Sequence, residues 1–166
     1  MVRRLPVLQT KDPEDLASEQ RPRTHWVAIA AGLTLSLWVP LLLVAFSIGR
    51  ALATRIAGVA DPAELGRAAS SGSRGLVALA LVLPAALSFA LACFVAAALV
   101  GRFGRHPRDA VMGTLIAAGA AWGLAVFQGS LAPWPVAVAT ALALAVLALG
   151  FGALGTRFGV RRRHRG

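Results

Sequence analysis

The side chains of this 166-residue chain that could perform acid–base or metal chemistry are few and far apart. His106 and Asp109 come closest to a catalytic pair, but they lie among arginines in a short segment typical of a solvated loop at a membrane surface. His25 and His164 have no second ligand at metal-binding spacing. No Ser-His-Asp order and no glycine-rich phosphate loop occurs. We therefore expect no catalytic residue, no bound metal and no cofactor.

Composition places the chain in the membrane class. Hydrophobic residues make up 57% of the sequence, charged residues only 14%, and the mean hydropathy is +0.70. The formal net charge of +10 would suggest a nucleic-acid partner in a soluble protein. Here every charged side chain lies outside the apolar stretches, where basic residues set topology and meet anionic head groups. We therefore expect no nucleic acid as a partner, and a lipid bilayer with anionic head groups instead.

Four apolar stretches are long enough to cross a membrane as helices, since a span needs about 20 residues. They cover residues 26–48, 76–100, 110–128 and 134–154, and none contains Asp, Glu, Lys, Arg or His. Asp-Pro pairs at residues 12–13 and 61–62 predict short surface helices over 13–19 and 62–70. The predicted fold is all-α: an integral membrane four-helix bundle over residues 26–154. A cytoplasmic segment of residues 1–25 precedes it, and a basic cytoplasmic tail of residues 155–166 follows it.

The distribution of basic residues favours a topology with both ends in the cytoplasm. Five precede the first stretch, three lie between the second and third, and five follow the fourth. Four lie between the first and second, and none between the third and fourth. Arg50 and Arg55, directly after the first stretch, fit this orientation least well. Lys11 is the only lysine, and together with abundant Ala, Leu and Gly this favours a bacterial genome and the bacterial cytoplasmic membrane.

The two halves of the chain share short sequences at corresponding places. Gly-Arg-Phe-Gly-Arg at 101–105 follows the second stretch, and Thr-Arg-Phe-Gly-Val-Arg at 156–161 follows the fourth. Pro-Arg and a capping side chain precede the first stretch at 22–24 and the third at 107–109. Two repeated hairpins related by an axis along the membrane normal would produce this pattern, and chance is the alternative. In either case we expect the glycines to stop the helices.

Small residues in the third and fourth stretches predict close helix packing. The third contains a G-x-x-x-G spacing that two further small residues extend backwards, and the fourth carries alanines at intervals of four. These faces would pack inside the bundle, or bind a second copy of the chain or a partner's helix. The predicted helix-packing residues are Gly113, Ala117, Gly119, Gly123, Ala137, Ala141 and Ala145.

Two prolines lie inside apolar stretches and predict helix kinks, because proline lacks the N–H that would bond one turn back. They are Pro40 in the first stretch and Pro84 in the second. Such breaks line substrate sites in some transporters, but more often they shape helix packing. The polar side chains inside the stretches are mainly serines and threonines, which commonly bond to carbonyls of their own helix.

Arginines cluster at the ends of the predicted helices that face the cytoplasm. A basic residue near an anionic leaflet contributes about 1 kcal/mol to membrane binding. Contact with anionic lipid is therefore predicted for Arg102, Arg105, Arg108, Arg157, Arg161, Arg162, Arg163 and Arg165.

Residues 92–125 combine small residues, Gly-Arg-Phe-Gly, a short basic loop and a Gly/Ala-rich helix. In this the chain resembles the YrzE-like group of small four-helix bacterial membrane proteins. The resemblance covers only the middle of the chain, and it implies the four-helix fold but no activity.

Three functional readings follow. Ionisable groups inside a membrane are costly and are kept mainly for function, so their absence from these stretches argues against a transporter or an enzyme. The favoured reading is a non-catalytic accessory, assembly or scaffolding subunit that packs against partner helices in a membrane complex. The alternative is an oligomeric small-solute channel or transporter component. A membrane enzyme working at the cytoplasmic face is the third.

Overall fold

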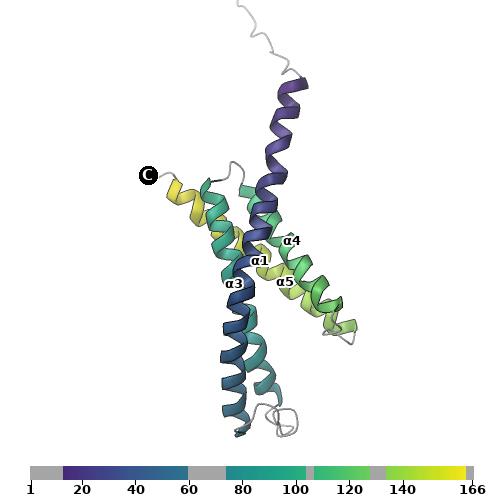
Figure 1. The fold of residues 1–166 in the computed structure, drawn as a ribbon, viewed down its shortest axis with the longest axis vertical. Coiled ribbons are helices and arrows are strands. Elements are labelled where there is room, and N and C mark those ends of the chain that lie inside the picture. The colour runs from purple at the N-terminus through teal and green to yellow at the C-terminus, as the bar shows by residue number, and fades with distance from the viewer. Residues whose placement is uncertain (1–12, 60–73, 104–106, 128–133, 164–166) are drawn as a thin grey trace, which may run out of the picture.

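The computed structural model describes residues 13–59, 74–103, 107–127 and 134–163. Within them lie four helices: α1 (Pro13–Ala57), α3 (Arg74–Phe103), α4 (Pro107–Phe127) and α5 (Trp134–Arg163), shown in Figure 1. All four are long and apolar enough to cross a membrane. The prediction of an all-α, multi-pass membrane bundle is thereby confirmed. The short helix expected over residues 62–70 falls outside the described residues.

The first helix is much longer than the apolar stretch that predicts it. α1 has 45 residues and includes the segment 13–19, which is therefore not a separate surface helix. At the other end it continues past Arg50 and Arg55 to Ala57. Gly58 then adopts a left-handed φ of 69°, and the N–H of Val59 donates to the carbonyl of Thr54 at 3.1 Å. This glycine ends the helix because it takes a backbone conformation that other residues rarely adopt.

Of the two Arg-Phe-Gly glycines expected to stop helices, Gly159 does not do so, whereas Gly104 directly follows Phe103, the last described residue of α3, and lies outside the described residues. α5 continues through Gly155 and Gly159 to Arg163, so most of the predicted tail is helical, and α3 continues through Gly101. A glycine inside a helix costs only about 1 kcal/mol relative to alanine, which tight packing can offset. α4 begins at Pro107, which places Asp109 in its first turn instead of at the capping position before the helix.

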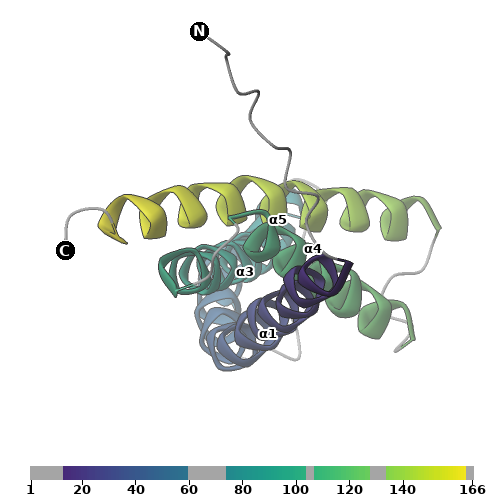
Figure 2. The same ribbon diagram turned by 90° about the horizontal axis from the view of Figure 1, so that it is seen from above.

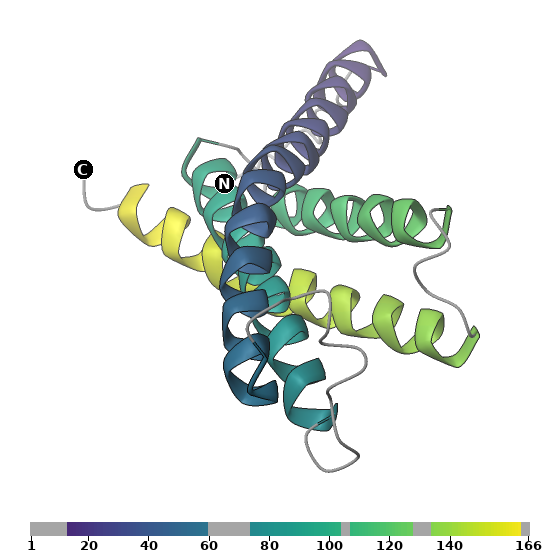
Figure 3. The same cartoon turned by 60° about the horizontal axis from the view of Figure 1, so that its bottom comes forward.

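The four helices form two hairpins that share one end and diverge at the other. α1 packs on α3 and α4 packs on α5, while α1 also contacts α4 and α3 contacts α5. The start of α1 and the end of α5 lie on the same side of the molecule, and the far ends of the two hairpins point apart (Figures 1 and 3). Seen from above, α1 and α3 are nearly end-on whereas α5 runs across the view (Figure 2). α5 therefore crosses the first hairpin steeply.

Residues at corresponding places of the two halves meet where the hairpins cross. Gly101 and Thr156 occupy the same position in the shared sequences, and a Cβ added at Gly101 would lie 3.0 Å from the carbonyl oxygen of Thr156. Gly113 of α4 faces Val27 and Ala30 of α1. When the two shared Pro-Arg sequences are aligned, the α1 position equivalent to Gly113 lies between these two residues. Contacts between equivalent residues are what a two-fold relation between hairpins produces near its axis.

The tightest contact joins the backbones of α3 and α5. Cβ atoms added at Gly155 and Gly159 would overlap the carbonyl oxygens of Phe94 and Ala98, respectively. Both glycines are buried, as is Thr156 between them. Close backbone approach through small residues is the main way in which helices associate where no hydrophobic effect drives them together.

The α3–α5 contact can be tested with a single methyl group. We expect Gly159→Ala to lower the free energy of unfolding by about 1–3 kcal/mol, because overpacking forces the helices apart. The matched control is Gly150→Ala on the same helix, where nothing lies within 4 Å of the Cβ position. Unfolding of both variants in a denaturing detergent, followed by circular dichroism, compares them. Equal stability of the two variants would contradict the contact.

Candidate functional site

The predicted helix-packing residues divide between the inside and the outside of the bundle. Gly113 is buried, with the carbonyl oxygen of Val27 lying 2.7 Å from its Cβ position, and Ala117 is fully buried. Gly119 and Gly123 instead have nothing within 4 Å of their Cβ positions. On α5, Ala137 is buried, whereas Ala141 and Ala145 are half-buried.

Helix geometry explains this division. At 3.6 residues per turn, Gly119 and Gly123 lie on the side of α4 opposite the buried Ala117 and Ala121. The small residues of α4 therefore form two faces, of which the bundle uses only one. Sequence reasoning missed the glycines that make the other close contacts, although Gly155 and Gly159 form a G-x-x-x-G of their own. Those missed are Gly49, Gly101, Gly152, Gly155 and Gly159.

Pro84 lies inside α3 and leaves the carbonyl of Ala80 without its usual donor, because proline has no N–H. α1 covers that carbonyl with Gly49, whose Cβ position would lie 2.9 Å from the Ala80 oxygen. Pro40 of α1, by contrast, is exposed, and so is Ser36, whose carbonyl it leaves without a helical partner. α1 changes direction along its length (Figure 3).

Except at Ser36, the serine and threonine hydroxyls of the described helices from residue 25 onward donate to backbone carbonyls. Thr34, Ser88 and Thr140 each donate to a carbonyl of their own helix at 2.7–2.8 Å. Thr114 lies 2.8 Å from the carbonyl of Val111 and 3.3 Å from that of Ala148, so its proton is shared between α4 and α5. Of these four hydroxyls, that of Thr114 links two helices, and the other three bond within their own helix.

Two tryptophans fasten the bundle in different ways. The indole N–H of Trp122 in α4 donates to the carbonyl of Ala137 in α5 at 2.8 Å. Trp38 in α1 meets the ring of Phe89 edge to face, with centroids 5.3 Å apart. Phe89 and Cys93 belong to a core cluster that is otherwise made of alanines on α4 and α5.

The ionisable groups considered as chemical candidates are not assembled into a site among the described residues. Asp109 is only 9% exposed, and its Oδ2 has no hydrogen-bond partner in the part of the chain that the structure describes. His106 and His164 lie outside that part, and His25 is exposed. Over the described ranges, no three His, Cys, Asp or Glu residues gather as metal ligands would.

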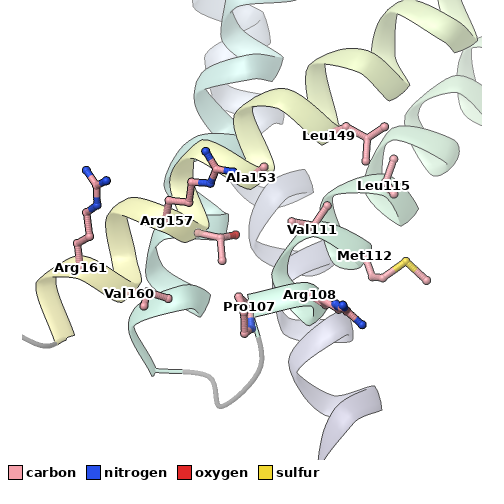
Figure 4. Close-up of a pocket in the computed structure, with 11 residues that line it drawn as sticks. Pro107, Arg108, Val111, Met112, Leu115, Leu149, Ala153, Arg157, Val160 and Arg161 are labelled. Carbon is pink, nitrogen blue, oxygen red and sulfur yellow. The ribbon is translucent and has the colours of Figure 1, made fainter.

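Three of the predicted lipid-contact arginines line one groove. Arg108 of α4 and Arg157 and Arg161 of α5 flank a cavity of about 740 Å³ between these two helices (Figure 4). Arg102 lies elsewhere, with its guanidinium 5.7 Å from the centre of the Phe103 ring. The side chains of the remaining four lie outside the described part: Arg105, Arg162, Arg163 and Arg165.

No family model, no curated protein and no solved structure matches this chain. Function therefore has to be argued from the two surfaces just described, the open glycine face of α4 and the arginine-flanked groove.

The indole bond across the second hairpin can be tested by removing its donor. We expect Trp122→Phe to lower the free energy of unfolding by about 0.5–1.5 kcal/mol, the usual net value of one hydrogen bond. Trp134→Phe is the control, because Trp134 is 72% exposed. Thermal unfolding of the purified chain in mild detergent measures both. A loss of stability no larger in Trp122→Phe than in the control would show that the bond contributes nothing.

Proposed function

We propose that this chain is a non-catalytic accessory, assembly or scaffolding subunit that packs against partner helices in a membrane complex. The observation that carries the proposal is the pair of open glycines on α4, Gly119 and Gly123. The YrzE-like resemblance is compatible with this role but adds no activity to it.

The open face of α4 has the composition of a helix-docking surface. Glycine in a helix interior lowers helix stability by about 0.5–1 kcal/mol relative to alanine. Other glycines inside this bundle offset that loss through close contacts between helices. Gly119 and Gly123 make no such contact with the part of the chain that the structure describes. Ile116 and Phe127, on the same side of α4, are 53% and 90% exposed. A partner helix seated there would gain both the smooth glycine surface and the flanking apolar side chains.

The arrangement of the hairpins supports the same role. The α4–α5 hairpin extends away from α1 and α3, so its outer surface is not covered by the rest of the chain (Figures 1 and 3). The hydroxyls of Thr34, Ser88 and Thr114 already bond to backbone carbonyls, so these groups are not free to guide a solute. Association therefore accounts for more of the structure than transport does.

For the membrane and the orientation, we propose the bacterial cytoplasmic membrane with both ends in the cytoplasm. The start of α1 and the end of α5 lie on one side of the bundle, as that orientation requires. The basic residues of α5 and of the first turn of α4 then face the anionic cytoplasmic leaflet.

Reporter fusions test the orientation. We expect green fluorescent protein fused after residue 166 to fluoresce and alkaline phosphatase at the same site to be inactive, because the first folds in the cytoplasm and the second in the periplasm. Fusions after Val59, beyond the end of α1, should give the opposite pattern. Active phosphatase at the C-terminus would reject the proposed orientation.

The docking face is tested by filling it. We expect the double variant Gly119→Ile, Gly123→Ile to lose proteins that co-purify with the full chain in mild detergent, measured by quantitative mass spectrometry. The bundle itself should fold normally, since nothing within the chain lies near these two positions.

The matched control is the double variant Gly32→Ile, Gly150→Ile, which fills two other open helical positions. It should retain the partners. Partners that both variants keep would place the interface elsewhere, and a wild-type chain that purifies alone would argue against an accessory role. Solute flux through liposomes containing only this chain would favour the channel or transporter alternative instead.

A further inference from the structure

We propose that the groove between α4 and α5 binds one anionic diacyl phospholipid. Its acyl chains would lie on the apolar floor, and its phosphate would lie among Arg108, Arg157 and Arg161. The groove lies nearer the start of α4 than Gly119 and Gly123 and shares no lining residue with them, so this inference is tested by different variants and does not depend on the proposed function.

The floor of the groove suits hydrocarbon. Its volume of about 740 Å³ falls in the range of roughly 300–1,000 Å³ that is usual for ligand pockets. Apart from the arginines, the polar lining side chain is Thr156, whose hydroxyl already donates to the carbonyl of Gly152 at 2.7 Å. The floor is made of Val111, Met112, Leu115, Leu149, Ala153 and Val160.

The depth of the groove favours a lipid over a transmembrane helix as its occupant. On α4 the lining extends eight residues, from Pro107 to Leu115, and on α5 it extends twelve residues, from Arg161 back to Leu149. At 1.5 Å per residue these lengths are about 12 and 18 Å. They lie on either side of half of a hydrocarbon core that is about 30 Å thick. A groove one leaflet deep fits acyl chains, whereas a transmembrane helix needs contact across both leaflets.

The charge of the groove selects an anionic head group. Arg108 stands on the α4 side of its basic end, and Arg157 and Arg161 stand on the α5 side (Figure 4). None of the lining residues is acidic. Guanidinium groups bind phosphate with paired hydrogen bonds. Basic pockets between helices at the cytoplasmic face are a known form of lipid recognition.

Native mass spectrometry of the full chain in mild detergent tests the proposal, with phosphatidylglycerol and phosphatidylcholine of identical acyl chains as probes. We expect one phosphatidylglycerol to be retained, and phosphatidylcholine to bind more weakly. The double variant Arg157→Gln, Arg161→Gln should reduce affinity for phosphatidylglycerol about thirtyfold, since each basic residue near an anionic lipid contributes about fivefold.

The matched control is Arg50→Gln, Arg55→Gln, which removes two exposed arginines from the opposite end of the first hairpin. It should keep the wild-type affinity for phosphatidylglycerol. An equal loss of affinity in both variants would show that the overall positive charge of the chain, and not this groove, binds the lipid, and it would overturn the proposal. Ala153→Phe fills the floor while keeping every charge, and should abolish retention. If that variant does not fold, Met112→Trp on the other wall, at a 56% exposed position, replaces it. Undiminished retention with a filled floor, or equal binding of the two lipids, would overturn the proposal.

Discussion

Backbone contact between α3 and α5 at Gly155 and Gly159 is the interaction on which the rest of the bundle depends. Inside a membrane, apolar side chains gain little by leaving lipid for protein, so association has to come from close packing and hydrogen bonds. The crossing of α3 and α5 supplies the close packing, and it sets the steep path of α5 across the first hairpin (Figure 2). The hydroxyl of Thr114 and the indole of Trp122 supply the hydrogen bonds, both between α4 and α5.

Because α5 crosses steeply, the bundle has two kinds of surface. Near the crossing the helices are covered by one another, and the core there is made mostly of alanine. Away from it the α4–α5 hairpin extends alone and its outer face meets the surroundings, whereas the groove opens beside the crossing, where Thr156 is part of its lining. The candidate sites for a partner helix and for a lipid thus both arise from the angle at which two glycines let the helices meet.

The sequence was sufficient for the class of fold and for the number and order of the membrane helices, because hydropathy over 20 residues reports directly on a span. It was less informative about where helices end. α1 runs to Ala57 and α5 to Arg163, since backbone hydrogen bonding continues after the apolar side chains stop. The sequence also could not distinguish a glycine that packs against another helix from one whose Cβ position faces open space. Gly113 and Gly119 lie on the same apolar helix, and the arrangement of the neighbouring helices decides which of them is in contact.

The contact of Gly49 with the carbonyl of Ala80 also fixes how deep the first helix sits. Pro84 leaves that carbonyl unpaired, and an unpaired acceptor in lipid is expensive unless something covers it. Sliding α1 by one turn would bring Ala45 or Ala53 to the place of Gly49. The methyl group of either alanine would then lie 2.9 Å from the Ala80 oxygen, which is closer than a methyl group can approach. One missing hydrogen bond in α3 therefore fixes the register of α1 against α3, and with it how far the N-terminal end of α1 extends beyond the other helices (Figure 1).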